Sequence, residues 1–296
     1  MIDRACISLN NNCNLRCKYC HFQDKQKNFS SFALYEVLEV IENVHAYCEE
    51  RGIKLFKLGI VGAGEPMLKK DVVFALLEHV RANNYSEIKM YTITNGTMLT
   101  YDDIVKFYEY RNDINVCFSL DGFEELHNYG RARYSDVMKS IERYKTVFGK
   151  SPAINATVNA ISVKRKERLL AFFKENDLTN VTFSKLVGYA EKDLKIADGD
   201  FAEFMQYAKA EGFACRQFNA AQVYDCTMYG KLCGVGRTNI FITPEGIYPC
   251  GRFYKNNEYL LGNYNLSLSE VERKMRKFAP VNDGECYYSK YVEENV

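Results

Sequence analysis

The stretch ACISLNNNCNLRCKYC, residues 5–20, joins a short apolar run to a loop with three cysteines. The run at 5–9 has the length and apolar character of a buried β-strand. Cys13, Cys17 and Cys20 follow it in an unusually long segment that precedes the first helical pattern. The sequence therefore places a thiol-rich loop directly after a strand.

Similar strand-like runs alternate with helical patterns as far as about residue 212. They cover residues 5–9, 55–61, 88–94, 114–120, 153–159 and 181–187. Repeated βα units predict a parallel sheet, either doubly wound or curved into an incomplete barrel. In both arrangements the active site forms in loops at the carboxyl ends of the strands, and the cysteine loop is one of these.

The helical patterns carry their own boundary signals. Between residues 34 and 52, apolar residues recur at steps of three and four, and Gly52 is expected to end this helix. The apolar stripe consists of Leu34, Val37, Leu38, Ile41, Val44 and Cys48. Thr100 with Asp103 and Ser267 with Glu270 have the spacing of a capping box, which predicts that helices begin there.

Composition excludes some classes of protein. With 39 Lys and Arg against 38 Asp and Glu, the net charge of +1 gives no overall field that favours nucleic acid or an anionic membrane. The N-terminal residues lack the apolar core of a signal peptide, and no run reaches the about 18 apolar residues of a membrane span. We therefore expect a cytoplasmic protein.

Eleven cysteines in such a chain indicate metal ligation more than disulfides. A structural zinc site needs four ligands, but the spacing Cys-x3-Cys-x2-Cys supplies three, and His21 is too close to Cys20 to wrap round the same ion. A [4Fe-4S] cluster with three thiolate ligands instead leaves one iron open to a small molecule.

The loop resembles that of the radical SAM superfamily, in which an aromatic residue, here Tyr19, precedes the last cysteine. The resemblance implies a partial (β/α)6 TIM-like barrel of the α/β class and a [4Fe-4S] cluster on Cys13, Cys17 and Cys20. It also implies that S-adenosylmethionine binds the open iron and is cleaved reductively to a 5'-deoxyadenosyl radical. This radical would then take a hydrogen atom from a substrate.

Further segments at strand ends resemble the superfamily's cofactor-contacting segments: GIVGAGEPM after the second strand, TNGTML after the third and SLDG after the fourth. The cofactor-binding residues implied by these segments, by the cysteine loop and by the strand at 153–159 are Tyr19, Gly62, Gly64, Glu65, Asn95, Ser119, Asp121 and Asn159.

Strand alternation makes an independent prediction. In residues 116–121, Val116, Phe118 and Leu120 lie on one face and Cys117, Ser119 and Asp121 on the other. The strand at 153–159 alternates in the same way. Helices should cover the apolar faces, and the polar faces should line a cofactor channel.

A second cysteine set lies in the last quarter of the chain, where TPEG (243–246) predicts a β-hairpin turn. Spacing alone permits a zinc ribbon. The segment resembles the auxiliary-cluster domain of the SPASM and twitch subfamilies, which implies a second [4Fe-4S] cluster on Cys226, Cys233, Cys250 and Cys286. Two clusters in total are expected. We predict a barrel domain at 1–212 and a small α+β iron-sulfur extension at 213–296.

The resemblance implies an oxidoreductase that receives electrons from a flavodoxin or ferredoxin-type donor. Its leading substrate is a ribosomally made peptide, which would be oxidised, crosslinked or epimerised. Because no leader-binding segment precedes the first strand, a dehydrogenase or epimerase of a sugar or aminocyclitol is the alternative. A non-catalytic iron-sulfur or zinc protein is the rival from another class.

Two related activities are disfavoured by departures from the pattern. Sulfatase-maturing relatives have an acidic base directly after the last hairpin cysteine, where this chain has Gly251. Molybdenum-cofactor relatives end in a glycine pair, whereas this chain ends in YVEENV.

The remaining cysteines, Cys6, Cys48, Cys117 and Cys215, are expected to be small core residues. Cys117 shares a face with Ser119 and Asp121, so it is also a candidate hydrogen donor of the kind used by radical epimerases. His127 and Arg131, in the loop after the fourth strand, are read either as a carboxylate-binding pair or as part of a solvated loop.

Overall fold

The computed structural model describes residues 1–22, 28–186, 193–213, 218–219, 222–223, 234–279 and 288. The strands are β1 (Arg4–Ile7), β2 (Phe56–Ile60), β3 (Ile88–Thr94), β4 (Ile114–Ser119), β5 (Ala153–Val158), β6 (Val181–Lys185), β7 (Phe218–Asn219), β8 (Gln222–Val223), β9 (Asn239–Thr243) and β10 (Gly246–Tyr248). The helices are α1 (Leu34–Arg51), α2 (Lys70–Ala82), α3 (Tyr101–Glu109), α4 (Glu124–Gly130), α5 (Tyr134–Phe148), α6 (Ala160–Lys164), α7 (Lys166–Glu175), α8 (Asp198–Ala210) and α9 (Leu268–Met275), and short 3-10 turns are η2 (Pro66–Lys69), η3 (Gly251–Phe253), η4 (Asn257–Tyr259) and η5 (Arg276–Phe278).

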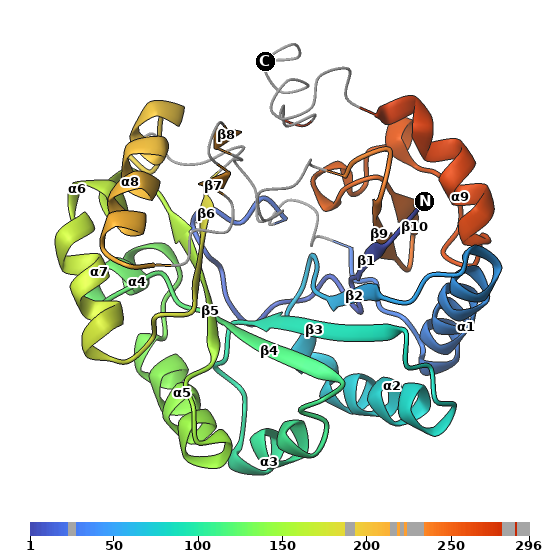
Figure 1. Cartoon of the computed structure of the whole chain (residues 1–296), viewed down its shortest axis with the longest axis horizontal. Coiled ribbons are helices and arrows are strands. Elements are labelled where there is room, and N and C mark those ends of the chain that lie inside the picture. Colours follow the sequence, from blue (N-terminus) through green and yellow to red (C-terminus); the bar gives the residue numbers. More distant parts are fainter. Residues whose placement is uncertain are drawn as a thin grey trace.

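Strands β1 to β6 form a parallel, curved sheet in chain order, with the helices on its outer side (Figure 1). All six predicted strands are confirmed, with ends that differ from the prediction by no more than two residues. The sheet curves without closing, which is the predicted partial barrel. No helix in the described ranges is both long and apolar enough to span a bilayer.

The predicted hairpin forms from β9 and β10, but it also extends the barrel sheet. Strand β9 pairs in parallel with β1, from Arg4 opposite Asn239 to Ile7 opposite Ile242, and β10 pairs antiparallel with β9. The sheet order is therefore β10-β9-β1-β2-β3-β4-β5-β6. Residues 234–279, which lie in the predicted extension, thus continue the same sheet, and β9 ends at the edge where the cysteine loop begins.

Helix α1 covers β1 and β2 with most of its predicted stripe. Val37, Ile41, Val44 and Cys48 are buried, and Gly52 ends the helix in the left-handed region at φ 64°. Leu34 is exposed, contrary to the prediction, because it is the first residue of the helix. The buried face of the helix also includes Val40 and Tyr47.

The two faces of β4 differ as predicted. Val116, Phe118 and Leu120 are buried on the helix side, where the Phe118 ring packs edge-on against Tyr144 of α5 at 5.8 Å between centroids. Ser119 lies opposite Asn155 of β5 on the other face. Because apolar residues cover the outer face, the polar residues of β4 and β5 point into the barrel.

Candidate functional site

The cysteine loop crosses the carboxyl ends of β1 and β2. Cys13, Cys17 and Cys20 are partly buried free thiols. On one side of the loop, the Glu65 amide donates to the Asn12 carbonyl at 2.8 Å. On the other side, the Lys18 amide donates to the Gly130 carbonyl at 2.9 Å. Backbone hydrogen bonds thus fix the loop to segments after β2 and β4.

The glycines after β2 allow this close approach. A Cβ atom on Gly62 would lie 2.2 Å from the Ser8 side chain, and one on Gly64 would lie 2.3 Å from the Asn12 carbonyl oxygen. Both distances are shorter than van der Waals contact, so a side chain at either position would displace the loop. The glycines predicted to bind the cofactor are required first for placing the cysteines.

Glu65 is buried and its carboxylate is fully engaged. It accepts hydrogen bonds from the Met67 amide at 3.0 Å, the Thr94 hydroxyl at 2.5 Å and the Asn95 amide at 2.8 Å. Burial raises the pKa of this carboxyl, and the Asn95 and Thr94 hydrogen bonds act against that shift. In this geometry Glu65 joins the ends of β2 and β3 and orders Asn95.

Asn95 connects Glu65 to the cysteine loop by hydrogen bonds. Its amide nitrogen donates to Asn14 Oδ1 at 2.8 Å and lies 4.0 Å from Cys13 Sγ. Its oxygen accepts from the Thr97 amide and hydroxyl at 3.0 and 2.8 Å. Thr97 in turn accepts from Asn14 at 2.8 Å. Asn95 therefore provides a side-chain donor beside the first cysteine.

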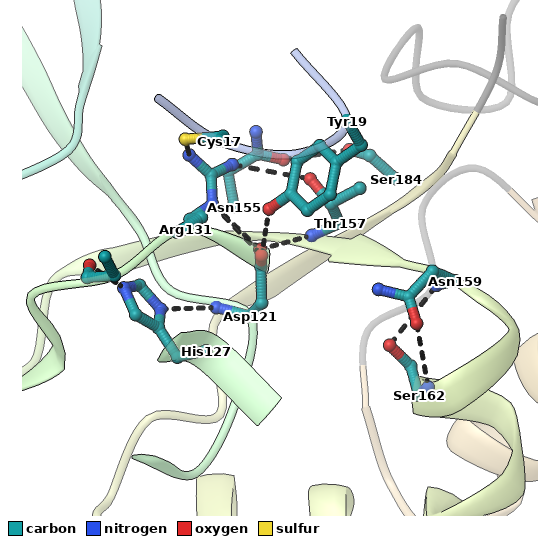
Figure 2. A network of polar contacts seen from close by, with 11 residues as sticks. Cys17, Tyr19, Asp121, His127, Arg131, Asn155, Thr157, Asn159, Ser162 and Ser184 are labelled. Carbon is teal, nitrogen blue, oxygen red and sulfur yellow. Dashed lines mark hydrogen bonds and ion pairs between the residues drawn. The ribbon is translucent and has the colours of Figure 1, made fainter. Parts of the chain in front are cut away.

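A second polar network lies at the ends of β4 and β5 (Figure 2). The buried Asp121 carboxylate accepts from the Tyr19 hydroxyl, from Arg131 Nε at 3.1 Å and from the Thr157 amide at 2.9 Å. Arg131 also lies 3.9 Å from Cys17 Sγ through Nη1 and 3.4 Å from Thr157 Oγ1 through Nη2. Asp121 and Arg131 thus form a buried ion pair next to a cluster-loop thiol.

His127 connects the backbone of Asp121 to the backbone that follows Arg131. Its Nδ1 accepts from the Asp121 amide at 3.3 Å, and its Nε2 lies 3.2 Å from the Ala132 carbonyl, to which it donates. Burial lowers the pKa of His127 to about 4, and the nearby Arg131 charge lowers it further, while Asp121 opposes the shift. The imidazole is therefore neutral at pH 7. The solvated-loop interpretation fits Ala132 and Arg133, which are exposed, but not His127, which is buried, or Arg131, whose side chain is only 13% exposed.

The other predicted cofactor residues differ in how available they are. Ser119 is buried inside the barrel, and its hydroxyl has no side-chain hydrogen bond within the described residues. Asn159 caps α6, since its oxygen accepts from the Ile161 and Ser162 amides at 2.9 and 3.1 Å. Figure 2 shows Asn159 apart from the Asp121 network. Only the amide nitrogen end of Asn159 is left for a ligand.

Cys117 faces the barrel interior beside Ser119, and burial raises its pKa to about 12. It is thus a protonated thiol at neutral pH. Cys48 is a core residue, as predicted. Cys6 and Cys117 are only partly buried, contrary to the prediction, because both lie on inward-facing positions of the sheet. Cys215 lies outside the described residues.

Of the second cysteine set, the structure describes Cys250, while Cys226, Cys233 and Cys286 lie outside the described residues. Cys250 is partly buried and precedes η3, directly after the hairpin. Within the described ranges no three His, Cys, Asp or Glu side chains gather as ligands of one metal ion. Thiolates that bind different irons of a cluster do not need to meet at one point.

The donor set of the first loop fits a cluster bound by three thiolates. Its three thiols occupy one loop, and donors lie near two of the sulfurs: Asn95 and the Leu15 amide near Cys13, and Arg131 near Cys17. Hydrogen-bond donors of this kind surround cluster sulfurs in iron-sulfur proteins. Burial raises the pKa of Cys17 to about 11, although Arg131 opposes this, so metal binding must displace a proton.

Sequence comparison decides the family. The radical SAM superfamily matches residues 7–184, which run from the end of β1 almost to the end of β6. The chain belongs to the radical SAM superfamily. The family implies a [4Fe-4S] cluster and S-adenosylmethionine, and the three thiols of the cysteine loop are the donor set that fits the cluster.

Three similar proteins are informative. The cysteine-type anaerobic sulfatase-maturating enzyme of Clostridium perfringens is 26% identical over 288 residues, covering 85% of this chain and 74% of the relative. Native anSMEcpe with bound AdoMet and Cp18Cys peptide has the same fold, with 20% identity, a TM-score of 0.74 and coverage of 93% and 82%. Streptococcus suis SuiB bound to precursor peptide SuiA matches at 17% identity, TM-score 0.73 and coverage of 95% and 68%.

Sequence reasoning did not find every residue of these networks. Thr94, Thr157 and Asn14 connect Glu65, Asp121 and Asn95, but each is a common polar residue at a strand or loop position. The sequence suggests that Arg131 binds a substrate or cofactor carboxylate, whereas the structure pairs it with the protein's own Asp121 carboxylate. The one available signal was the arginine ten residues after an inward-facing aspartate, which gives no geometry by itself.

Proposed function

We propose that this radical SAM enzyme is an oxidoreductase that modifies a ribosomally made peptide, with Cys13, Cys17 and Cys20 as the ligands of its first [4Fe-4S] cluster. The observation that carries the proposal is the convergence of the cysteine loop with the ends of β2, β3 and β4 at one edge of the sheet. When bound, the cluster supplies the electron for reductive cleavage of S-adenosylmethionine, whose nucleoside fragment then takes a hydrogen atom from the substrate.

The chain's residues divide into two groups around that cofactor. We assign direct contact to the backbone at Gly62 and Gly64, to the Ser119 hydroxyl, to the amide nitrogen of Asn159 and to the ring of Tyr19. Asn95 acts as a hydrogen-bond donor beside Cys13. Glu65 and Asp121 act through other residues, because their carboxylate oxygens already accept hydrogen bonds from protein donors.

The proposal includes a second cluster on Cys226, Cys233, Cys250 and Cys286. Cys250 follows the hairpin that extends the sheet beside β1. Such a cluster would accept an electron from the substrate after hydrogen abstraction, which favours a net oxidation or a crosslink. A flavodoxin or ferredoxin-type protein would supply electrons to the first cluster.

A peptide is favoured as the substrate because two of the similar structures carry bound peptides. Sulfatase maturation is disfavoured by position 251. A Cβ atom on Gly251 would lie 3.2 Å from the Phe241 ring, which is tighter than ordinary contact. An acidic side chain at this position would require the buried Phe241 ring of β9 to shift by a few tenths of an ångström, so packing against this ring disfavours it.

Cleavage of S-adenosylmethionine is the first test. After anaerobic reconstitution, the protein should contain iron and sulfide and should form 5'-deoxyadenosine when dithionite and S-adenosylmethionine are added. Cys17→Ala should abolish the product, whereas Cys6→Ala, which removes a partly buried thiol of β1, should retain it. Zinc in place of iron, with no nucleoside formed, would identify a non-catalytic metal protein instead.

The substrate class is tested by trapping hydrogen transfer. Deuterated precursor peptides should pass deuterium into 5'-deoxyadenosine, whereas deuterated aminocyclitols or sugars should not; the reverse result would assign the enzyme to small molecules.

Epimerisation would also require a thiol that gives a hydrogen atom to the substrate radical, and we assign that role to Cys117. The resulting thiyl radical would regain one electron from the second cluster and one proton from solvent. For an epimerase, Cys117→Ala should still form nucleoside but lose solvent deuterium incorporation into the peptide.

A further inference from the structure

Asp121 connects three segments that are far apart in the sequence. Its carboxylate accepts from Tyr19 in the cysteine loop, from Arg131 after α4 and from the Thr157 amide of β5. Only 1% of the residue is exposed. A buried carboxylate is stabilised by this number of donors, and loss of its charge would leave the paired guanidinium buried without compensation.

Arg131 is held by every nitrogen of its guanidinium group. Nε bonds to Asp121, Nη2 approaches Thr157 Oγ1, and Nη1 lies 3.9 Å from Cys17 Sγ. The guanidinium carbon also lies 5.4 Å from the centre of the Tyr19 ring. The positive charge is therefore directed at the middle cysteine of the loop, as Figure 2 shows.

The backbone that presents Arg131 has a costly conformation. The next two residues, Ala132 and Arg133, have φ of 86° and 62°, in the left-handed region that non-glycine residues rarely adopt. His127 donates to the Ala132 carbonyl and accepts from the Asp121 amide. Gly130 lies against Tyr19, where a Cβ atom would be 2.6 Å from the ring. The surrounding contacts thus fix one position for the arginine.

We propose that the Asp121–Arg131 ion pair sets the reduction potential of the cluster at Cys17, with Arg131 supplying the charge and Asp121 acting as the positioning residue. This inference rests on the proposed function, because it requires Cys17 to be a cluster ligand. Reduction adds negative charge to a cluster, so a nearby cation raises its potential and a nearby anion lowers it. The two charges therefore have opposite effects, and each can be removed by a change to a neutral polar side chain, which is isosteric for Asp121→Asn.

The test is a potentiometric titration followed by electron paramagnetic resonance in a Cys250→Ala background, which removes a ligand of the proposed second cluster. Arg131→Gln should shift the potential of the first cluster to a more negative value. Asp121→Asn, which leaves the guanidinium uncompensated, should shift it to a more positive value. Tyr19→Phe and Arg131→Lys should shift it less than either. Arg143→Gln removes an exposed arginine that donates to the Leu99 carbonyl at 2.8 Å, and should leave the potential unchanged.

Shifts of the reduction potential in opposite directions in Arg131→Gln and Asp121→Asn support the inference. Loss of a purely structural contact would not make the direction of the shift depend on which charge is removed. Shifts of the same sign, or none, overturn it. It is also overturned if Arg131→Lys, Arg131→Gln and Asp121→Asn all fail to take up iron while Arg143→Gln does, because the pair would then serve only folding. If the unsubstituted protein binds no cluster, the proposed function fails and the inference fails with it. A cluster that cleaves S-adenosylmethionine without the expected shifts removes the inference alone.

Discussion

Positions 62 and 64 show how the absence of a side chain places the site. Both glycines lie where the segment after β2 meets the segment after β1, and their missing Cβ atoms would overlap Ser8 and Asn12. Sequence alone identifies these positions as a glycine-rich turn. The distances show that the turn sets the position of the cysteine loop, whatever ligand it binds.

Gly62→Ala should lower the free energy of unfolding by about 1–3 kcal/mol, because the added methyl forces apart two buried segments. Urea unfolding of the iron-free protein measures this change. Gly199→Ala is the matched control, since Gly199 is in the first turn of α8 with nothing within 4 Å of its Cβ position. It should raise stability by about 0.5–1 kcal/mol. Equal effects at both positions would contradict the steric argument.

His127 should make stability depend on pH between about 4 and 6.5. Its folded pKa of about 4 is below the ordinary value, so the unfolded state binds a proton that the folded state does not. Stability is therefore highest above pH 6.5 and falls on acidification, by up to about 3 kcal/mol at pH 4.

In the iron-free protein, His127→Gln should flatten the dependence of unfolding free energy on pH between 7 and 5, measured by urea denaturation at each pH. His79, which is partly exposed and lies 2.6 Å from Glu42 through Nε2, provides a comparison. His79→Gln should leave most of the pH dependence in place. A slope unchanged by His127→Gln would show that the imidazole is protonated in the folded state.

At the scale of elements, capping residues determine where helices start at the mouth of the barrel. Thr100 Oγ1 accepts from the Asp103 amide at 3.2 Å, and Asp103 accepts from the Thr100 amide at 2.9 Å and from Lys70 at 2.9 Å. The capping box predicted from the spacing is confirmed here. Burial opposes ionisation of Asp103, but the hydrogen bonds from Thr100 and Lys70 lower its pKa overall.

Thr100→Ala should therefore cost about 1 kcal/mol of stability, because the Asp103 amide loses its acceptor and the cap is opened. Thr100→Ser retains the hydroxyl and should cost less than half as much. Thermal or urea unfolding of the two variants, measured side by side, distinguishes the cap from the packing of the threonine methyl group. A serine variant as unstable as the alanine variant would assign the loss to packing.

Local patterns predicted elements well and their distant partners poorly. Strand alternation identified β1 to β6 and the inward face of β4, because both follow from the chain's own period of two. Pairing of β9 with β1 depends on residues about 235 positions apart, and the run at 239–243 carries no sign of its parallel partner. For the same reason, sequence placed Asp121 at the site but could not show that Tyr19, Arg131 and Thr157 fill its acceptor positions.

At the scale of the whole molecule, the C-terminal segment and the barrel share both a sheet and a helix contact. Beyond the β9–β1 pairing, Glu272 of α9 accepts from the Tyr47 hydroxyl of α1 at 2.9 Å and pairs with Arg51 at 3.2 Å. The Glu272 side chain is 8% exposed. Burial acts against its ionised form, but the amino group of Met1 at 2.8 Å, Tyr47 and Arg51 lower the pKa of its carboxyl overall. Two separate contacts thus oppose independent unfolding of residues 234–279.

Glu272→Gln should lower the free energy of unfolding by about 1.5–3 kcal/mol, the range for hydrogen bonds to a charged group, and unfolding should remain a single transition. Glu270→Gln is the control on the same helix: Glu270 is more exposed and pairs with Lys274 at 3.3 Å, so its loss should cost less than about 1 kcal/mol. Hydrogen exchange followed by mass spectrometry should show β9 and β1 losing protection together in Glu272→Gln. If β9 instead exchanged early while β1 to β6 stayed protected, the C-terminal segment would be a separate folding unit, and the shared sheet would not couple it to the barrel.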